Sequence, residues 1–106
     1  MTNRNALRRL RILQKLSLAG GEWLGAPMVL RMLRDDVDLK PDLVKVLRSL
    51  IWLEDHNLAE VRTVDLDDDA VVFARISAEG LAYLNSDELI EGILHPSECL
   101  EVSGGS

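Results

Sequence analysis

The chain has 106 residues, of which 47% are hydrophobic, so its length and composition fit one globular domain with a substantial core. No apolar run approaches the ~20 residues that a membrane-spanning helix needs, so we expect no membrane partner. The N-terminal stretch is basic but has no continuous apolar segment behind it, and Cys99 is the only cysteine. We therefore expect no signal peptide, no intramolecular disulfide and a cytoplasmic location.

The net charge of −6 hides an uneven distribution of charge along the chain. Residues 1–48 carry ten basic and five acidic residues, whereas residues 49–106 carry two basic and thirteen acidic residues. A basic half suggests an anionic partner. The alternative is that the two halves neutralise each other, either within the fold or across a dimer.

Residues 4–18 have the spacing of an amphipathic helix with leucines on one side. The other side carries a basic stripe of Arg4, Arg8, Arg11 and Lys15. Gly20 and Gly21 are expected to end this helix, because glycine tolerates the left-handed conformation found at helix C-termini. A short extended piece follows, in which we expect Trp23 to join the core.

Two further helices are predicted, each opened by a proline, a residue that fits the first helical turn. Pro27 opens the second helix, and Pro41 opens a third that runs to about His56, with Asn57 as its C-terminal cap. A helical projection gives the third helix an apolar arc of Leu43, Val44, Val46, Leu47, Leu50, Ile51 and Leu53. Its outer arc is predicted to hold Asp42, Lys45, Arg48, Ser49, Trp52, Asp55 and His56.

The second half of the chain begins with two strand-like runs, residues 58–64 and 70–76, joined by a polar linker that predicts a hairpin. Ser77 is expected to cap a fourth helix that ends near Asn85. A fifth helix is predicted at about 86–95 and is ended by Pro96. Its apolar face would consist of Leu89, Ile90, Ile93 and Leu94. Residues 102–106 are expected to form a disordered tail.

The predicted order is helix, strand, helix, helix, strand, strand, helix, helix. This is a mainly α fold with a small β-hairpin (α+β), in one domain of residues 1–101 with a core at about 4–85. The second and third helices have helix-turn-helix spacing. The chain resembles the winged-helix (winged helix-turn-helix) superfamily in Leu43-Val44-x-x-Leu47-x-x-Leu50, Leu53-x-x-x-Asn57-Leu58 and Ile76-Ser77-x-x-Gly80-x-x-x-Leu84. Its size and layout also resemble those of the ArsR-like winged-helix proteins of Mu-like bacteriophages and prophages.

The resemblance implies a DNA-binding protein, such as a transcriptional regulator, whose third helix enters the major groove of duplex DNA. Lys45, Arg48 and Ser49 could read base edges, since arginine offers a bidentate fork to guanine. Arg31 and Arg34, with the basic stripe of the first helix, could contact phosphates. The predicted fifth helix would supply a homodimer face. The alternative for Lys45 and Arg48 is an ordinary solvated helix face.

Two acidic features argue against DNA binding: Asp42 at the start of the third helix, and the predicted wing tip, where a phosphate backbone would be repelled. The tip carries Asp65, Asp67, Asp68 and Asp69. A second hypothesis is therefore a protein-interaction module, for example a phage packaging or assembly adaptor. Trp52 would then be part of the protein interface, because tryptophan is favoured at binding hot spots. The alternative is that Trp52 packs under the wing or the C-terminal helix.

No pattern for catalysis, a metal or a cofactor is present. The aspartates at 65–69 lack the glycine and glutamate positions of an EF-hand loop. His56, His95 and Cys99 show no paired spacing of the kind found in zinc sites, and Cys99 has no evident activating base. We expect a protein that is not an enzyme and that needs no cofactor.

Overall fold

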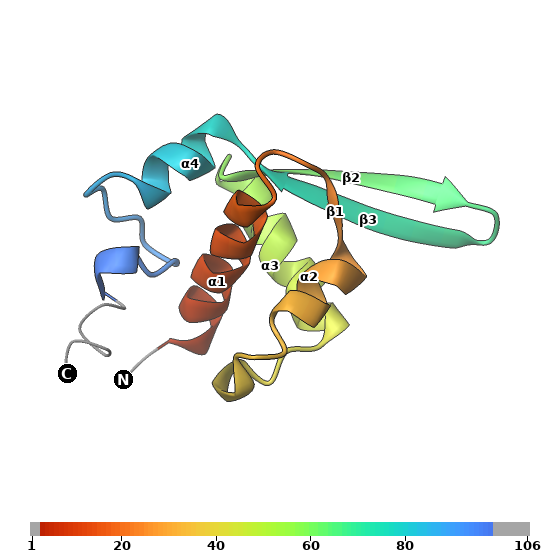
Figure 1. Ribbon diagram of the computed structural model, residues 1–106, viewed down its shortest axis with the longest axis horizontal. Helices are drawn as coiled ribbons and strands as arrows, with labels where there is room; N and C mark the ends of the chain where they lie inside the picture. The colour runs from red at the N-terminus through yellow and green to blue at the C-terminus, as the bar shows by residue number, and fades with distance from the viewer. Residues whose placement is uncertain (1–2, 99–106) are drawn as a thin grey trace.

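The computed structural model describes residues 3–98. Cys99 and the predicted tail at 102–106 lie outside the described residues. The elements, in chain order, are α1 (Arg4–Leu18), β1 (Leu24–Gly25), α2 (Ala26–Met32), the 3-10 helix η1 (Val37–Leu39), α3 (Leu43–Asp55), β2 (Ala59–Leu66), β3 (Asp69–Ile76) and α4 (Ala78–Leu84) (Figure 1). The predicted α+β class and the predicted order through residue 84 are confirmed, and η1 is an addition.

Side-chain caps explain why three of the helices begin where they do. The Asn3 side chain accepts a hydrogen bond from the backbone N–H of Asn5 at 2.9 Å, and Asp42 accepts one from the N–H of Lys45 at 2.8 Å. Ser77 Oγ accepts from the N–H of Gly80 at 3.0 Å at the start of α4. Such caps satisfy amide groups that have no partner within the helix, and each typically contributes about 1 kcal/mol.

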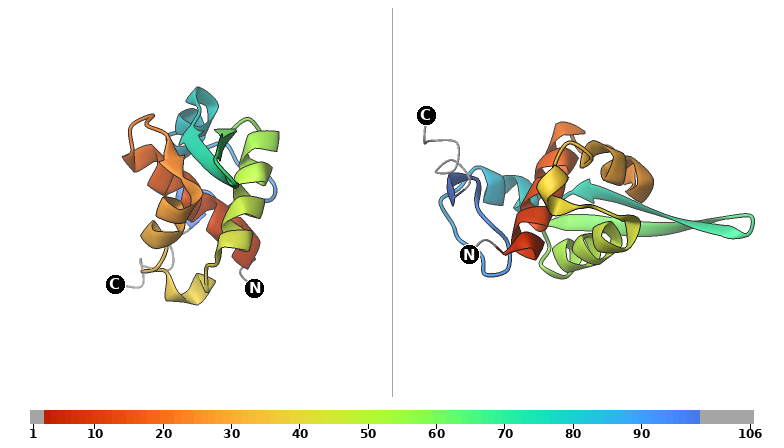
Figure 2. Two further views of the ribbon diagram at one scale, coloured as in Figure 1. Left: turned by 90° about the vertical axis from the view of Figure 1, so that its right-hand side faces the viewer. Right: turned by 90° about the horizontal axis from the view of Figure 1, so that it is seen from below.

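The three strands form an antiparallel sheet in the order β1-β3-β2. The β2–β3 pairing runs without a break from Ala59↔Ile76 to Leu66↔Asp69, so the loop shrinks from the predicted five residues to Asp67 and Asp68. Asp67 has a φ of 57°, a conformation that a two-residue hairpin turn requires and that aspartate tolerates. The resulting ribbon projects from the body and accounts for much of its 49 Å long axis (Figures 1 and 2).

The core lies where α1, α2 and α3 meet the base of the sheet (Figure 2). The fully buried side chains of α1 are Leu10, Ile12, Leu13 and Leu16. They pack against Val46, Leu50 and Leu53 of α3 and Val29 of α2. No helix among the described residues is long and apolar enough to cross a membrane.

The predicted fifth helix at 86–95 is wrong. Residues 87–95 are irregular, with a turn at Glu91 and Gly92. Pro96 is predicted to end a helix, but in the structure it begins a helical turn. Gly92 has a φ of 99°, which interrupts any helix, and the Tyr83 hydroxyl donates to the carbonyl of Leu94 at 2.9 Å. The segment 86–98, which we call the C-terminal strap, therefore lies along α1 and α4 (Figure 1).

Buried His95 anchors the strap. Its Nδ1 lies 2.8 Å from Ser97 Oγ, and its Nε2 lies 2.5 Å from the carbonyl oxygen of Ser86. Its ring also meets the Tyr83 ring edge-on, with centroids 5.3 Å apart. Both ring nitrogens thus have partners, which is the usual requirement for a buried polar side chain.

Candidate nucleic-acid interface

The solvent-facing side of α3 differs from the predicted one. Val44 and Ile51, predicted to be buried, are 57% and 54% exposed, whereas Ser49, predicted to face outward, is only 4% exposed. The buried side is formed by Val46, Ser49, Leu50 and Leu53. The prediction failed because α3 is apolar around most of its circumference, so hydrophobicity alone does not fix its rotation about its axis.

The exposed centre of α3 is a row of Val44, Arg48 and Ile51, which we call the α3 stripe. These residues are spaced i, i+4 and i+7, so they lie one above another on a single helix face. Among the described residues, Arg48 makes no ion pair, and its guanidinium is free to bind a ligand. Asp55 continues the same face one turn further on.

Lys45 and Asp42 at the start of α3 balance each other. Lys45 is half-buried, and its Nζ donates to the carbonyl of Lys40 at 3.2 Å and lies 3.9 Å from Asp42 Oδ2. The other carboxylate oxygen of Asp42 caps the helix. The negative charge that argued against DNA binding is thus partly compensated locally.

The other basic residues that are predicted to contact phosphates differ in how exposed they are. Arg4, Arg31 and Arg34 are exposed, and no ion pair within residues 3–98 involves them. Lys15 is half-buried, as is Arg11, whose Nε lies 3.6 Å from Asp36 Oδ1. The prediction that Arg8 belongs to an exposed stripe is wrong, because the residue is 6% exposed and faces α3.

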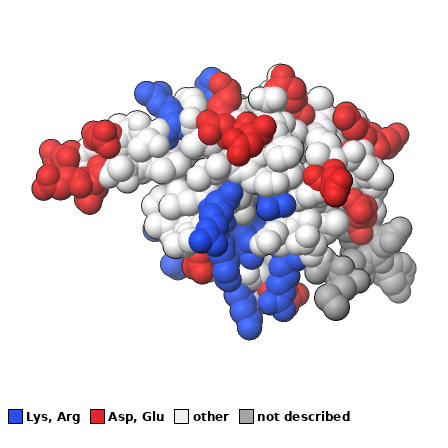
Figure 3. Space-filling view, turned by 180° about the vertical axis from the view of Figure 1, so that it is seen from behind, with Lys and Arg blue, Asp and Glu red and all other residues white. Residues whose placement is uncertain are grey.

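The wing is acidic at its tip. Its two arginines lie nearer the body, where they contact Trp23. All four tip aspartates are exposed, and they form the separate acidic group at the end of the ribbon in Figure 3. Arg62 and Arg75 lie 5.5 and 4.5 Å from the centroid of the Trp23 ring, and Arg75 Nε lies 2.9 Å from Glu60 Oε2. Trp23 is thus half-buried beneath these two arginines. The prediction that Trp23 joins the core is wrong.

Trp52 is half-buried and packs against the core. Its ring stacks on His56 with centroids 3.7 Å apart, and the guanidinium carbon of Arg9 lies 4.5 Å from the ring centroid. Gly92 of the strap lies so close that a Cβ there would come within 2.6 Å of the Trp52 ring. The interpretation of Trp52 as an exposed hot spot is therefore wrong. The ring packs under the C-terminal strap, which is not the helix that the alternative assumed.

The predicted apolar dimer face does not form a single surface. Ile93 is buried in the core, Ile90 and Leu94 are half-buried against it, and only Leu89 is exposed. Residues 3–98 also contain no group of three or more His, Cys, Asp or Glu side chains placed to hold a metal ion.

The charges of the two halves of the chain do not pair with each other in the described part. Each of the three ion pairs joins residues of the same half: Arg11 with Asp36, Lys45 with Asp42, and Arg75 with Glu60. Figure 3 likewise shows basic side chains gathered on the body, apart from the acidic end of the ribbon. Neutralisation between the halves through ion pairs within the fold, one of the two alternatives for the charge asymmetry, is therefore not found in residues 3–98.

Neither the known family models nor the curated proteins include a match to this chain. Among solved structures, the chain is similar to PadR of Bacillus subtilis in complex with operator DNA, with a TM-score of 0.56 and 13% sequence identity. The similarity covers 92% of this chain and 59% of PadR, so the chain spans little more than half of PadR's length. The fold of this protein is a winged helix.

Proposed function

We propose that the protein binds duplex DNA by placing α3 in the major groove, and that it acts as a transcriptional regulator. The observation that carries the proposal is the α3 stripe: an unpaired Arg48 between two exposed β-branched side chains, on the helix that the helix-turn-helix presents outward. The similarity to PadR supports the fold that this docking requires.

The chemistry of the α3 stripe matches that of base edges in the major groove. Arginine can bind guanine O6 and N7 through two parallel hydrogen bonds, and apolar side chains contact the methyl group of thymine. Val44 and Ile51 lie one turn to either side of Arg48, so the stripe favours a half-site in which thymines flank a guanine. Neither residue is predicted from the sequence to contact DNA, because the apolar pattern of the helix places both in the core.

Phosphate contacts would come from exposed cations on neighbouring elements. Arg31 and Arg34 lie at the end of α2 and just after it, and Arg4 lies at the start of α1. Without ion pairs among residues 3–98, they can release counterions from DNA on binding. The wing tip would stay away from the phosphates. Homodimerisation on a palindromic site, a cytoplasmic location and a bacteriophage setting remain predictions.

The test is a selection of bound sequences from a randomised duplex pool at low salt, followed by fluorescence anisotropy. We expect Arg48→Ala to weaken binding to the selected duplex by about 5- to 150-fold, which corresponds to about 1–3 kcal/mol for a bidentate base contact. Arg62→Ala is the charge-matched control on the wing, and we expect it to change the affinity by less than about threefold. No duplex binding at low salt, or equal losses in the two variants, would contradict the proposal.

A second candidate function is a protein-interaction module that does not read DNA, such as a phage assembly adaptor. The observation that favours it is the exposure of four large apolar side chains on α2 and α3: Met28, Leu43, Val44 and Ile51. Exposed apolar side chains of this kind often mark a protein-binding surface. Under this hypothesis Ile51→Asp would abolish a stable complex with a protein partner, while the purified protein would bind no duplex even at low salt.

A further inference from the structure

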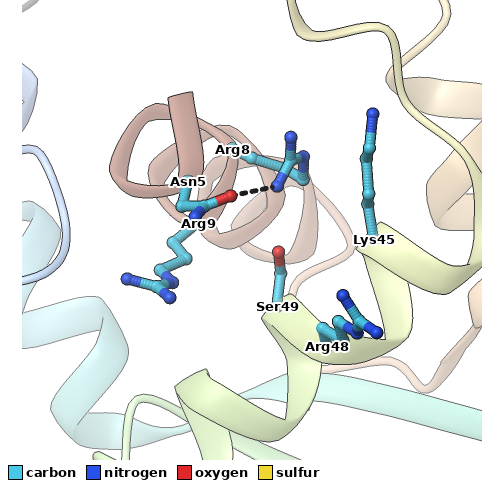
Figure 4. A pocket seen from close by; sticks show the side chains of 6 residues that line it. All are labelled: Asn5, Arg8, Arg9, Lys45, Arg48 and Ser49. Carbon is cyan, nitrogen blue, oxygen red and sulfur yellow. Dashed lines mark hydrogen bonds between the residues drawn. The ribbon is translucent and has the colours of Figure 1, made fainter. Parts of the chain in front are cut away.

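A cavity of about 210 Å³ lies between α1 and α3, and its lining is basic. Its walls are formed by Asn5, Arg8, Arg9, Lys45, Arg48 and Ser49 (Figure 4). The cavity is smaller than the roughly 300–1,000 Å³ of sites that hold drug-sized ligands. Its size therefore suits a small ion or a single charged group.

The cavity concentrates positive charge without an acidic side chain in its lining. Four of the six lining residues are Arg or Lys, and within residues 3–98 Arg8, Arg9 and Arg48 make no ion pair. Burial and the nearby positive charge of Arg8 both lower the pKa of Arg9. Like charges gathered in a partly desolvated site favour an anion, because burying a charge without a counter-charge is costly.

Two nearly buried polar side chains face the cavity with unused hydrogen-bonding capacity. Arg8 donates from Nη1 to Asn5 Oδ1 at 2.8 Å, but its buried Nε has no partner among the described residues. Ser49 is 4% exposed, and its hydroxyl rises from α3 toward Arg8 (Figure 4). In the described part of the chain this hydroxyl makes no hydrogen bond either. A bound oxyanion would supply acceptors to the Ser49 hydroxyl and to the guanidinium N–H groups of Arg8 that line the cavity, whereas the buried Nε shows that this arginine has few partners of its own.

We propose that this cavity is a binding site for a phosphate group or a similar small oxyanion. Arg8 and Ser49 hold the anion from within, and Arg48 contacts it from the α3 side. Lys45 also lines the cavity, but its Nζ is already engaged by the Lys40 carbonyl and Asp42. Arg9 is already engaged with the Gly92 carbonyl at 2.7 Å and with Trp52, so it contributes charge more than direct contact. The phosphate group could belong to a free small anion or to the backbone of bound DNA.

The site shares Arg48 with the α3 stripe, and this sharing couples it to the proposed function. A free anion that recruits Arg48 into the cavity would draw it away from a base edge and weaken duplex binding. Equilibrium linkage makes the effect reciprocal, so bound duplex would weaken anion binding by the same factor. This coupling depends on DNA binding, whereas the anion site itself does not.

The test of the site is a titration of the isotope-labelled chain with inorganic phosphate, followed by NMR, with chloride used to hold the ionic strength constant. We expect saturable shifts centred on residues 5, 8, 45, 48 and 49, with a Kd on the order of 1 mM or below. Ser49→Ala removes one donor and should raise the Kd about 10-fold, as should Arg8→Met. Arg62→Met, which removes an arginine outside the cavity, should leave the Kd unchanged.

Three results would overturn the proposal: shifts that do not saturate, shifts spread over all basic residues, or a Kd that Ser49→Ala does not change. The conservative Ser49→Ala keeps the test decisive if Arg8→Met does not fold.

A second arm of the experiment identifies the source of the phosphate group. If Ser49→Ala weakens duplex binding in chloride, the cavity takes a backbone phosphate. If duplex binding is unchanged but loses its sensitivity to phosphate, the ligand is a free anion. If no duplex binds, the DNA proposal fails while the phosphate titration still tests the cavity.

Discussion

Gly80, in the strand-to-helix junction, should tolerate no side chain at all. A Cβ at this position would lie 2.1 Å from the carbonyl oxygen of Leu58 and 2.8 Å from Ile76 Cγ1. Real Cβ atoms essentially never come closer than 3.0 Å to a neighbour, so the backbone would have to shift by roughly 1 Å. The same Leu58 carbonyl accepts a hydrogen bond from the N–H of Ser77 at 3.2 Å, which such a shift would break.

The expected cost of Gly80→Ala combines two effects. Overpacking contributes about 1–3 kcal/mol and the weakened hydrogen bond about 0.5–1.5 kcal/mol, so we expect a loss of about 2–4 kcal/mol in the free energy of unfolding. For a domain of this size the Tm should fall by roughly 10–25 °C. The assay is thermal unfolding followed by far-UV circular dichroism.

The matched control is Gly25→Ala. Gly25 has a φ of −68°, and the nearest atoms to an added Cβ, on Phe73 and Pro27, would be 3.7 Å away. Reduced entropy of the unfolded chain then offsets the weaker N-cap, so its stability should stay within about 1 kcal/mol of the parent. If Gly80→Ala melted within about 3 °C of the parent protein, the close approach of Gly80 to Leu58 would be refuted.

Three further substitutions test the other contacts, each by chemical denaturation. Ser77→Ala removes the cap of α4 and the 2.6 Å hydrogen bond from Ser77 Oγ to the Asn57 carbonyl, and should cost about 1–2 kcal/mol; no loss would mean that α4 begins without it. His95→Ala leaves the Ser86 carbonyl without its partner and should cost about 1–3 kcal/mol, with faster proteolysis in residues 86–98 as the local readout. Trp52→Leu removes the stacking on His56 and Arg9 and should cost about 1–3 kcal/mol, whereas a fully exposed Trp52 would give a change near zero.

The parts of the fold that could be predicted are those controlled by local chemistry. Pro27 falls in the first turn of α2 and Ser77 caps α4, as expected. Asn57 has a φ of 61°, which lets the chain leave α3 and enter β2 two residues later. Each of these residues acts on its immediate neighbours, so its meaning can be interpreted without knowledge of the tertiary structure.

The C-terminal strap could not be predicted because its contacts are distant in sequence. The apolar spacing at 89–94 is typical of a helix, yet the chain there is held by Arg9 binding the Gly92 carbonyl and by the backbone N–H of Leu94 donating to the Ala6 carbonyl. Both partners lie in α1, more than eighty residues away. Such tertiary contacts override local propensity, and no local pattern reveals them.

The residues of the candidate site could be predicted only in part, again because tertiary packing decides which of them are buried. The cations were assigned to the correct elements from charge alone, but their burial depends on how α1 and α3 cross. Arg8 and Ser49 turned inward at that crossing, and Val44 and Ile51 turned outward. A helix whose binding face is itself apolar gives no amphipathic signal for the direction of solvent.

The distance between the opposite charges bears on whether the acidic wing prevents DNA binding. β2 and β3 each have eight residues, and at ~3.3 Å per residue the acidic tip lies roughly 26 Å from the base of the ribbon. The Debye length at physiological ionic strength is only about 8 Å, so the tip charges are strongly screened at the body. The wing tip can therefore repel a phosphate backbone near it without cancelling the attraction that Arg31, Arg34 and Arg48 exert elsewhere. The overall net charge is consequently a poor guide to whether this protein binds DNA as proposed, and the charge around α3 is the relevant quantity.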